Sequence, residues 1–99
     1  MLNNELLSKL QDLKRESEES KTRLSELEIT EESGNDLVRI TMNGNRKLKL
    51  VEINADLNQI DKEDLEELIG IAFNRVLAKV DEVNEQEALS SAQSLFSGL

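Results

Sequence analysis

The sequence contains no histidine, no cysteine, no tryptophan and no tyrosine, and it has only two phenylalanines. Without histidine and cysteine, the chain cannot build histidine-based catalytic triads, thiol nucleophiles, disulfides or the usual zinc sites. Phe73 and Phe96 alone provide no platform on which a series of bases or sugars could stack. These absences predict a protein that is not an ordinary enzyme, and we expect no catalytic residue, no metal site and no cofactor.

Basic residues are scarce beside acidic ones, with 12 Lys and Arg against 21 Asp and Glu and a net charge of −9. Such a charge on average repels nucleic acid and anionic membranes. No apolar run approaches the length of a membrane span, and the N-terminus lacks a basic-then-apolar signal pattern. We therefore expect a soluble, cytoplasmic protein whose partners include no membrane and no small-molecule substrate.

The residues that are present predict one folded domain that begins with a long helix. Leu, Ile, Val and Phe make up 30 of the 99 residues, enough for a single core. Between residues 2 and 27, a coiled-coil seam with alternating steps of four and three runs through Leu6, Leu10, Leu13, Ser17, Ser20, Leu24 and Leu27. A helix of about 25 residues is about 37 Å long, whereas a domain of this size has a radius of gyration near 13 Å. We expect this helix to project beyond its domain or to meet a partner.

Apolar residues at every second position then predict three short antiparallel strands. The first begins at Leu27 and is ended by the turn residues 33–36, and the others cover residues 37–42 and about 46–53. Asn43-Gly44 indicates a type I′ turn between the second and third strands, with positive φ at both residues.

In the third strand, Leu48 and Leu50 point one way while Val51 and Ile53 point the other. Either a bulge shifts the pleat near Leu50 or both faces are covered. Because one helix covers one face only, we expect a subunit contact on the second face. The predicted dimer interface consists of Leu48, Leu50, Val51 and Ile53.

A second helix follows Asp61, which is a good N-cap, and its broad apolar stripe, which includes Phe73, is expected to cover the sheet. After Asn84 the apolar positions rotate to another face of the helix. We therefore predict one domain over residues 1–84 and a tail over residues 85–99, either a short helix or a segment ordered by a partner. The predicted fold class is α+β, in the order α-β-β-β-α with a small antiparallel sheet and two long helices.

The basic residues are unevenly distributed. Residues 37–51 contain no acid and carry four basic residues, Arg39, Arg46, Lys47 and Lys49. These either keep an edge strand soluble or form a hairpin that contacts DNA phosphates without reading bases. A second set of candidates lies on the first helix, where intervening glutamates offset it: Lys14, Arg15, Lys21 and Arg23.

Several stretches together resemble one known family. They are residues 27–34 (LEITEESG), 37–44 (LVRITMNG), 51–54 (VEIN) and 72–74 (AFN). Over about Leu6 to Asn84 the chain is similar to the YbaB/EbfC family of small bacterial nucleoid-associated proteins. The resemblance implies a homodimer with helices that project like the arms of tweezers, and binding to duplex DNA with little sequence preference.

The resemblance also implies a place in the nucleoid and a role in bacterial chromosome organisation. The alternative is a homodimeric protein-interaction adaptor without direct DNA binding. Such an adaptor would use its apolar helix ends and a tail that contains Leu89, Leu95 and Phe96.

Overall fold

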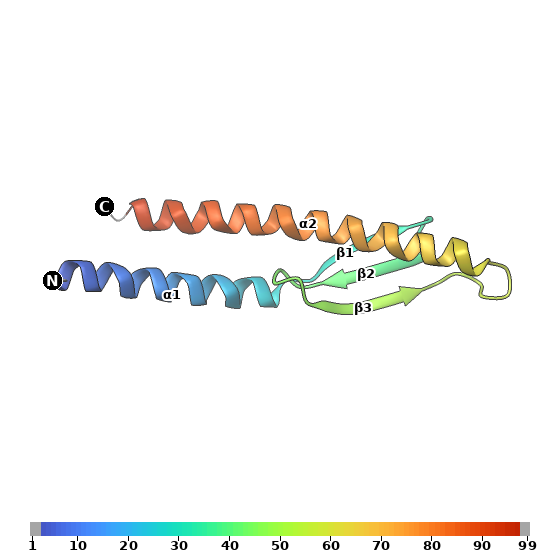
Figure 1. Cartoon of the computed structure of the whole chain (residues 1–99), viewed down its shortest axis with the longest axis horizontal. Helices are drawn as coiled ribbons and strands as arrows, with labels where there is room; N and C mark the ends of the chain where they lie inside the picture. Colours follow the sequence, from blue (N-terminus) through green and yellow to red (C-terminus); the bar gives the residue numbers. More distant parts are fainter. Residues whose placement is uncertain (1–2, 98–99) are drawn as a thin grey trace.

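Figure 1 shows the computed structural model of the chain, which describes residues 3–97. Its elements are α1 (Asn4–Glu26), β1 (Ile29–Ser33), β2 (Val38–Met42), β3 (Leu48–Ile53) and α2 (Lys62–Ser97). The predicted α+β class and the order of elements are confirmed, although β1 begins at Ile29 and not at Leu27. The predicted helical positions at Leu2 and Leu99 lie outside the described residues.

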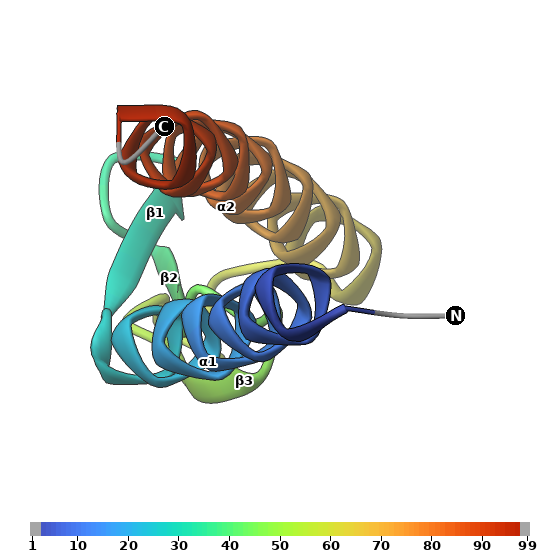
Figure 2. The ribbon, with the colours of Figure 1, turned by 90° about the vertical axis from the view of Figure 1, so that its left-hand side faces the viewer.

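The molecule is a rod because both helices extend beyond the same end of the sheet (Figure 1). Its extents are 68 × 20 × 17 Å, and its radius of gyration is 19.4 Å, against about 13 Å for a compact domain of this length. The prediction that the first helix projects beyond its domain is therefore confirmed. We call α1 and residues 85–97 of α2 the arms, which run antiparallel with both chain ends at the same end of the rod (Figures 1 and 2).

The core lies between β2 and the first half of α2. Alternate residues of the central strand, Val38, Ile40 and Met42, are buried with at most 2% of their surface exposed. They pack against α2 residues spaced four apart, which are Ala72, Val76 and Val80. Every second residue of a strand and every fourth residue of a helix lie on one face, so β2 and α2 present two matching apolar rows. The burial of these rows supplies the main stabilisation of the fold.

A β-bulge in β3 decides which of its side chains face α2. Ile53 and Val51 pair with Val38 and Ile40, but Met42 pairs with Leu48, so Lys49 is an extra residue. Of the two alternatives that the sequence left open, the bulge is confirmed. Since directly paired residues share a face, Leu48, Val51 and Ile53 lie on the α2 side of the sheet.

The opposite face of the sheet does not need the cover that the sequence suggested. Apart from Leu50, the register places there the polar residues Thr30, Thr41, Glu32, Arg39 and Glu52. The apolar surface that lacks cover is instead on the α2 side, because α2 packs on β1 and β2 and does not reach β3. The second face is therefore largely polar, and the contact between subunits expected there stays a prediction.

The expectation of a separate short helix after Asn84 is wrong, because α2 continues to Ser97 without a break. The apolar positions rotate because α2 leaves the sheet and then runs beside α1. The division into residues 1–84 and 85–99 stays a prediction. Phe73, expected in the core, lies one position beyond the row that contacts β2, and 38% of its surface is exposed.

Candidate nucleic-acid interface

The loop between β2 and β3, which carries half of the predicted hairpin cations, is closed by a hydrogen bond from the Asn43 amide to the Lys47 carbonyl (2.9 Å). The register leaves three residues between these two, and Arg46 has the positive φ, +63°. The predicted type I′ turn is therefore wrong, since three-residue loops favour a left-handed residue in last position. The buried Asn43 Oδ1 accepts the amides of Asn45 (2.8 Å) and Lys47 (3.0 Å), which fixes the loop.

This loop is attached to the end of α1. The Gly44 amide donates to the Leu24 carbonyl (2.8 Å), and Asn45 Nδ2 donates to the Lys21 carbonyl (3.0 Å). Asn84 Nδ2 of α2 donates to the Gly44 carbonyl (2.7 Å). A Cβ on Gly44 would lie 2.8 Å from the Leu24 carbonyl, so only glycine permits this approach. The arm and the hairpin, predicted as separate candidate sites, are therefore adjacent at this junction.

All five arginines of the chain have a carboxylate oxygen within 4.0 Å. Arg46 Nη2 lies 2.7 Å from Asp81 Oδ1, which ties the hairpin loop to α2. Arg39 lies between Glu32 and Glu52 in the strand register. An arginine already paired with a carboxylate loses that partner before it contacts phosphate, so these side chains are weakened as DNA ligands.

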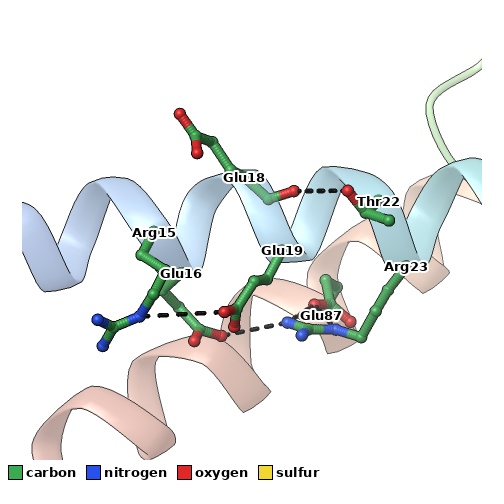
Figure 3. A network of polar contacts seen from close by, with 7 residues as sticks. All are labelled: Arg15, Glu16, Glu18, Glu19, Thr22, Arg23 and Glu87. Atoms are coloured by element: carbon green, nitrogen blue, oxygen red, sulfur yellow. Dashed lines mark hydrogen bonds and ion pairs between the residues drawn. The ribbon is translucent and has the colours of Figure 1, made fainter.

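Arg23 makes the most extensive of these contacts (Figure 3). Its guanidinium donates to Glu87 of α2 at 2.6 and 3.0 Å and to Glu16 at 3.1 Å. The hydrogen bond from Arg23 lowers the pKa of the Glu87 carboxyl, and the hydrogen bond to Glu87 raises the pKa of Arg23. Within residues 3–97 this is the one ion pair that joins the two arms. Arg15, beside it, pairs with Glu19 on its own helix (3.9 Å).

The lysines differ from the arginines. Among residues 3–97, no carboxylate lies within 4.0 Å of the ammonium of Lys14, Lys21, Lys47 or Lys49. All four are exposed, and Lys14 and Lys21 share one face of α1 because they are seven residues apart. Lys21 and Lys47 lie at the junction, Lys49 follows in β3, and Lys14 lies two helical turns before Lys21 on α1. These four exposed cations are thus available to bind an anion.

The structure therefore divides the eight predicted DNA-binding residues by side-chain type. Four are arginines that pair with carboxylates: Arg15, Arg23, Arg39 and Arg46. The remaining four are the exposed lysines. Sequence reasoning missed Lys9, which is also exposed without a carboxylate partner in the described part of the chain, and it missed Asn45, whose amide joins hairpin to arm. Charge counting along α1 could have found Lys9, but no sequence signal indicates the role of Asn45.

The predicted interface residues of β3 are all exposed. The exposed fractions of Leu48, Leu50, Val51 and Ile53 lie between 41% and 50%. Three of them continue the apolar core surface past the edge of α2, and Leu50 points to the other face. A strand with this composition at the open edge of a sheet is a site for association with another chain.

Two other kinds of site are not found within residues 3–97. No group of three or more acidic side chains is placed to hold a metal ion. No helix there is both long enough and apolar enough to span a bilayer.

Comparison with known proteins decides the family. A sequence model of the YbaB/EbfC DNA-binding family matches residues 1–95. The chain belongs to this family. It is similar to a nucleoid-associated protein of Flavobacterium johnsoniae, with 37% identity over 82 residues that cover 83% of this chain and 76% of the relative. It is also similar to one of Hahella chejuensis, with 36% identity over 87 residues that cover 88% and 80%. The predicted family is thereby confirmed.

The fold is found in a solved structure as well. The crystal structure of an uncharacterized protein from Helicobacter pylori superposes with a TM-score of 0.78 at 24% sequence identity. The match covers 91% of this chain and 97% of the other. The two chains therefore share one fold.

Proposed function

We propose that the protein is a non-enzymatic, homodimeric nucleoid-associated protein that binds duplex DNA through phosphate contacts with little sequence preference. Membership of a DNA-binding family supports the class of ligand, and the names of its relatives support a place in the nucleoid of the cytoplasm. We infer the phosphate contacts from the exposed lysines on α1 and the hairpin, which have no carboxylate partner within residues 3–97. An ammonium is a compact charge that suits phosphate oxygens, and contacts to phosphate carry no base information.

Only part of the acidic excess lies away from the junction, because the four acids of residues 81–87 lie beside it. Residues 52–67 contain seven acidic residues and one basic residue. They include the start of α2, at the end of the rod opposite to the arms (Figure 1). The α1 helix has six acidic and five basic residues and is close to neutral. DNA that approaches the junction is directed away from the acidic end and meets the local lysines, together with Asp81 and Glu87, which are paired with Arg46 and Arg23.

The dimer supports this function by doubling the lysines. The uncovered β3 side chains Leu48, Val51 and Ile53 are the surface that we assign to the contact between subunits. A second copy there would remove apolar surface from water at both edges. Lys47 and Lys49 lie beside these residues, in the hairpin loop and in β3. The dimer would therefore combine the Lys47 and Lys49 side chains of both copies in one assembly.

The salt dependence of binding tests the proposal. Eight lysines per dimer limit the slope of log K against log salt to about −7. The variant Lys47→Glu/Lys49→Glu removes four cations per dimer, so the slope should flatten by about four, and affinity should fall alike on duplexes of different sequence. The measurement is a titration of several random duplexes over a range of salt concentrations.

A matched variant separates local from global charge. Lys62→Glu/Lys79→Glu changes the net charge by the same amount, but these lysines lie on α2 and already pair with Glu66 and Glu82. It should leave the slope unchanged. Equal loss in both variants would contradict a lysine site at the junction, and absence of duplex binding at every salt would favour the protein-interaction adaptor.

A further inference from the structure

The outer parts of the two arms carry apolar side chains that the described chain covers only in part. On α1, Leu6, Leu10 and Leu13 are 44–49% exposed, and on α2, Leu89 and Phe96 are 58% and 70% exposed. The arms run side by side here (Figure 2), yet their facing surfaces do not close. We call residues 4–16 of α1 and 88–97 of α2 the outer arms.

Two adjoining hollows mark the space between the arms. One has a volume of about 340 Å³ and the other about 310 Å³, and both are lined by Leu13, Glu16 and Leu95. The hollow nearer the sheet is also lined by small side chains from both helices, which are Ser17, Ser20, Ala88 and Ser91. Large apolar residues toward the tip and small ones behind them form a surface of knobs and holes.

The charge of the outer arms differs from that of the rest of the chain. Residues 88–97 contain no charged side chain, and residues 4–16 contain three acids and three bases. Elsewhere one sign predominates, with seven acids against one base in residues 52–67 and four bases without an acid in residues 37–51. The outer arms are therefore a surface at which two copies of a chain of net charge −9 can meet without like-charge repulsion.

We propose that the outer arms of one copy pack against the outer arms of a second copy. The partner's leucines have the size and polarity to enter the holes between small residues, and the mixed charges of α1 offer pairs of opposite sign to an identical helix. Duplex DNA is a poor occupant of the outer hollow, because its basic lining residues Lys9 and Arg15 are balanced by Asp12 and Glu16. Lys14, which we assign to DNA, does not line either hollow. A strongly charged protein would find no complementary charge here.

This contact would join one DNA-bound dimer to another. That consequence rests on the proposed DNA binding. The β3 edge and the outer arms lie in different parts of a 68 Å rod, so one copy can use both at the same time. Paired arms would then hold two duplexes together. Bridging between separate duplexes is the activity that the geometry adds to simple binding.

Sedimentation of four variants tests the assembly. The wild type should form species larger than twice 11.2 kDa, and the arm variant Leu10→Gln/Leu13→Gln/Phe96→Gln should stop at two copies. The edge variant Val51→Thr/Ile53→Thr should also stop at two, and the combination should be a monomer. Leu57→Gln, which alters a leucine that is 67% exposed outside both surfaces, is the control and should match the wild type.

A capture experiment tests the function. Beads that carry one duplex should retain a second, labelled duplex with the wild type but at least tenfold less with the arm variant, whose affinity for a single duplex should stay within twofold. Circular dichroism verifies the fold of each variant.

Large assemblies and bridging that survive in the arm variant would overturn the proposal, and so would a wild type that binds duplex without exceeding two copies. The second outcome would leave the proposed function intact. Arm-dependent assembly without duplex binding would overturn the proposed function and leave the arm contact standing.

Discussion

In the sheet half of the rod, the facing rows of β2 (Val38, Ile40 and Met42) and α2 (Ala72, Val76 and Val80) are almost fully buried. In the arm half, Leu6, Leu10 and Leu13 of α1 are nearly half exposed. Both halves have regular apolar patterns in sequence. They differ because the sheet half packs a helix across two strands, while the arms are two helices that lie beside each other. Leu24, next to the junction, is the one residue of α1 that is buried.

The two halves of the rod contribute differently to the stability of the fold and to the surface available for partners. Burial of the β2 and α2 rows stabilises the folded chain, while the arms contribute little to stability and much to the area available for partners. We therefore expect substitutions to have large effects in the sheet half, intermediate effects at the junction and small effects in the arms.

The largest effect should follow truncation of the core. Ile40→Ala removes a side chain that is 1% exposed and should lower the free energy of unfolding by about 2–5 kcal/mol. Leu10→Ala, at an exposed helix position, should change it by less than about 0.5 kcal/mol. Urea denaturation at low protein concentration measures both. Similar losses in the two variants would mean that the halves do not differ as described.

An intermediate effect is expected where the two halves meet. Gly44→Ala places a Cβ 2.8 Å from the Leu24 carbonyl and should destabilise the protein by about 1–3 kcal/mol, the range for overpacking. Trypsin should then cleave α1 at Lys21 faster than in the wild type. Gly70→Ala is the matched control, since no atom lies within 4 Å of its Cβ. It should stabilise α2 by about 0.5–1 kcal/mol.

The smallest effect should come from the ion pair between the arms. Arg23 lowers the pKa of Glu87 below its ordinary value of 4.5, so the stabilisation is present above pH 4.5 and is lost as pH falls through the lowered pKa. Glu87→Gln should lower the Tm slightly at pH 7, and its difference from the wild type should vanish in acid. Glu85→Gln, an adjacent exposed acid, should show no such pH dependence.

Local patterns in the sequence were sufficient for the order of elements. The four-and-three spacing of leucines before residue 27 and the period of two in the strands depend on neighbouring residues, so they are readable without the fold. The same holds for the two alternatives at Leu50, because an extra residue shifts the alternation whatever covers it. The family resemblance, carried by short stretches in a fixed order, was confirmed by comparison.

The tertiary structure determined which side chains are buried and which are paired with an opposite charge. Arg46 and Lys47 are neighbours in sequence, yet Arg46 meets Asp81, 35 residues away, while Lys47 meets no carboxylate within residues 3–97. Phe73 and Val76 belong to one apolar stripe, but the crossing of α2 over β2 buries only Val76. Periodicity records which face of an element is apolar, and only the path of the chain determines how much of that face another element covers.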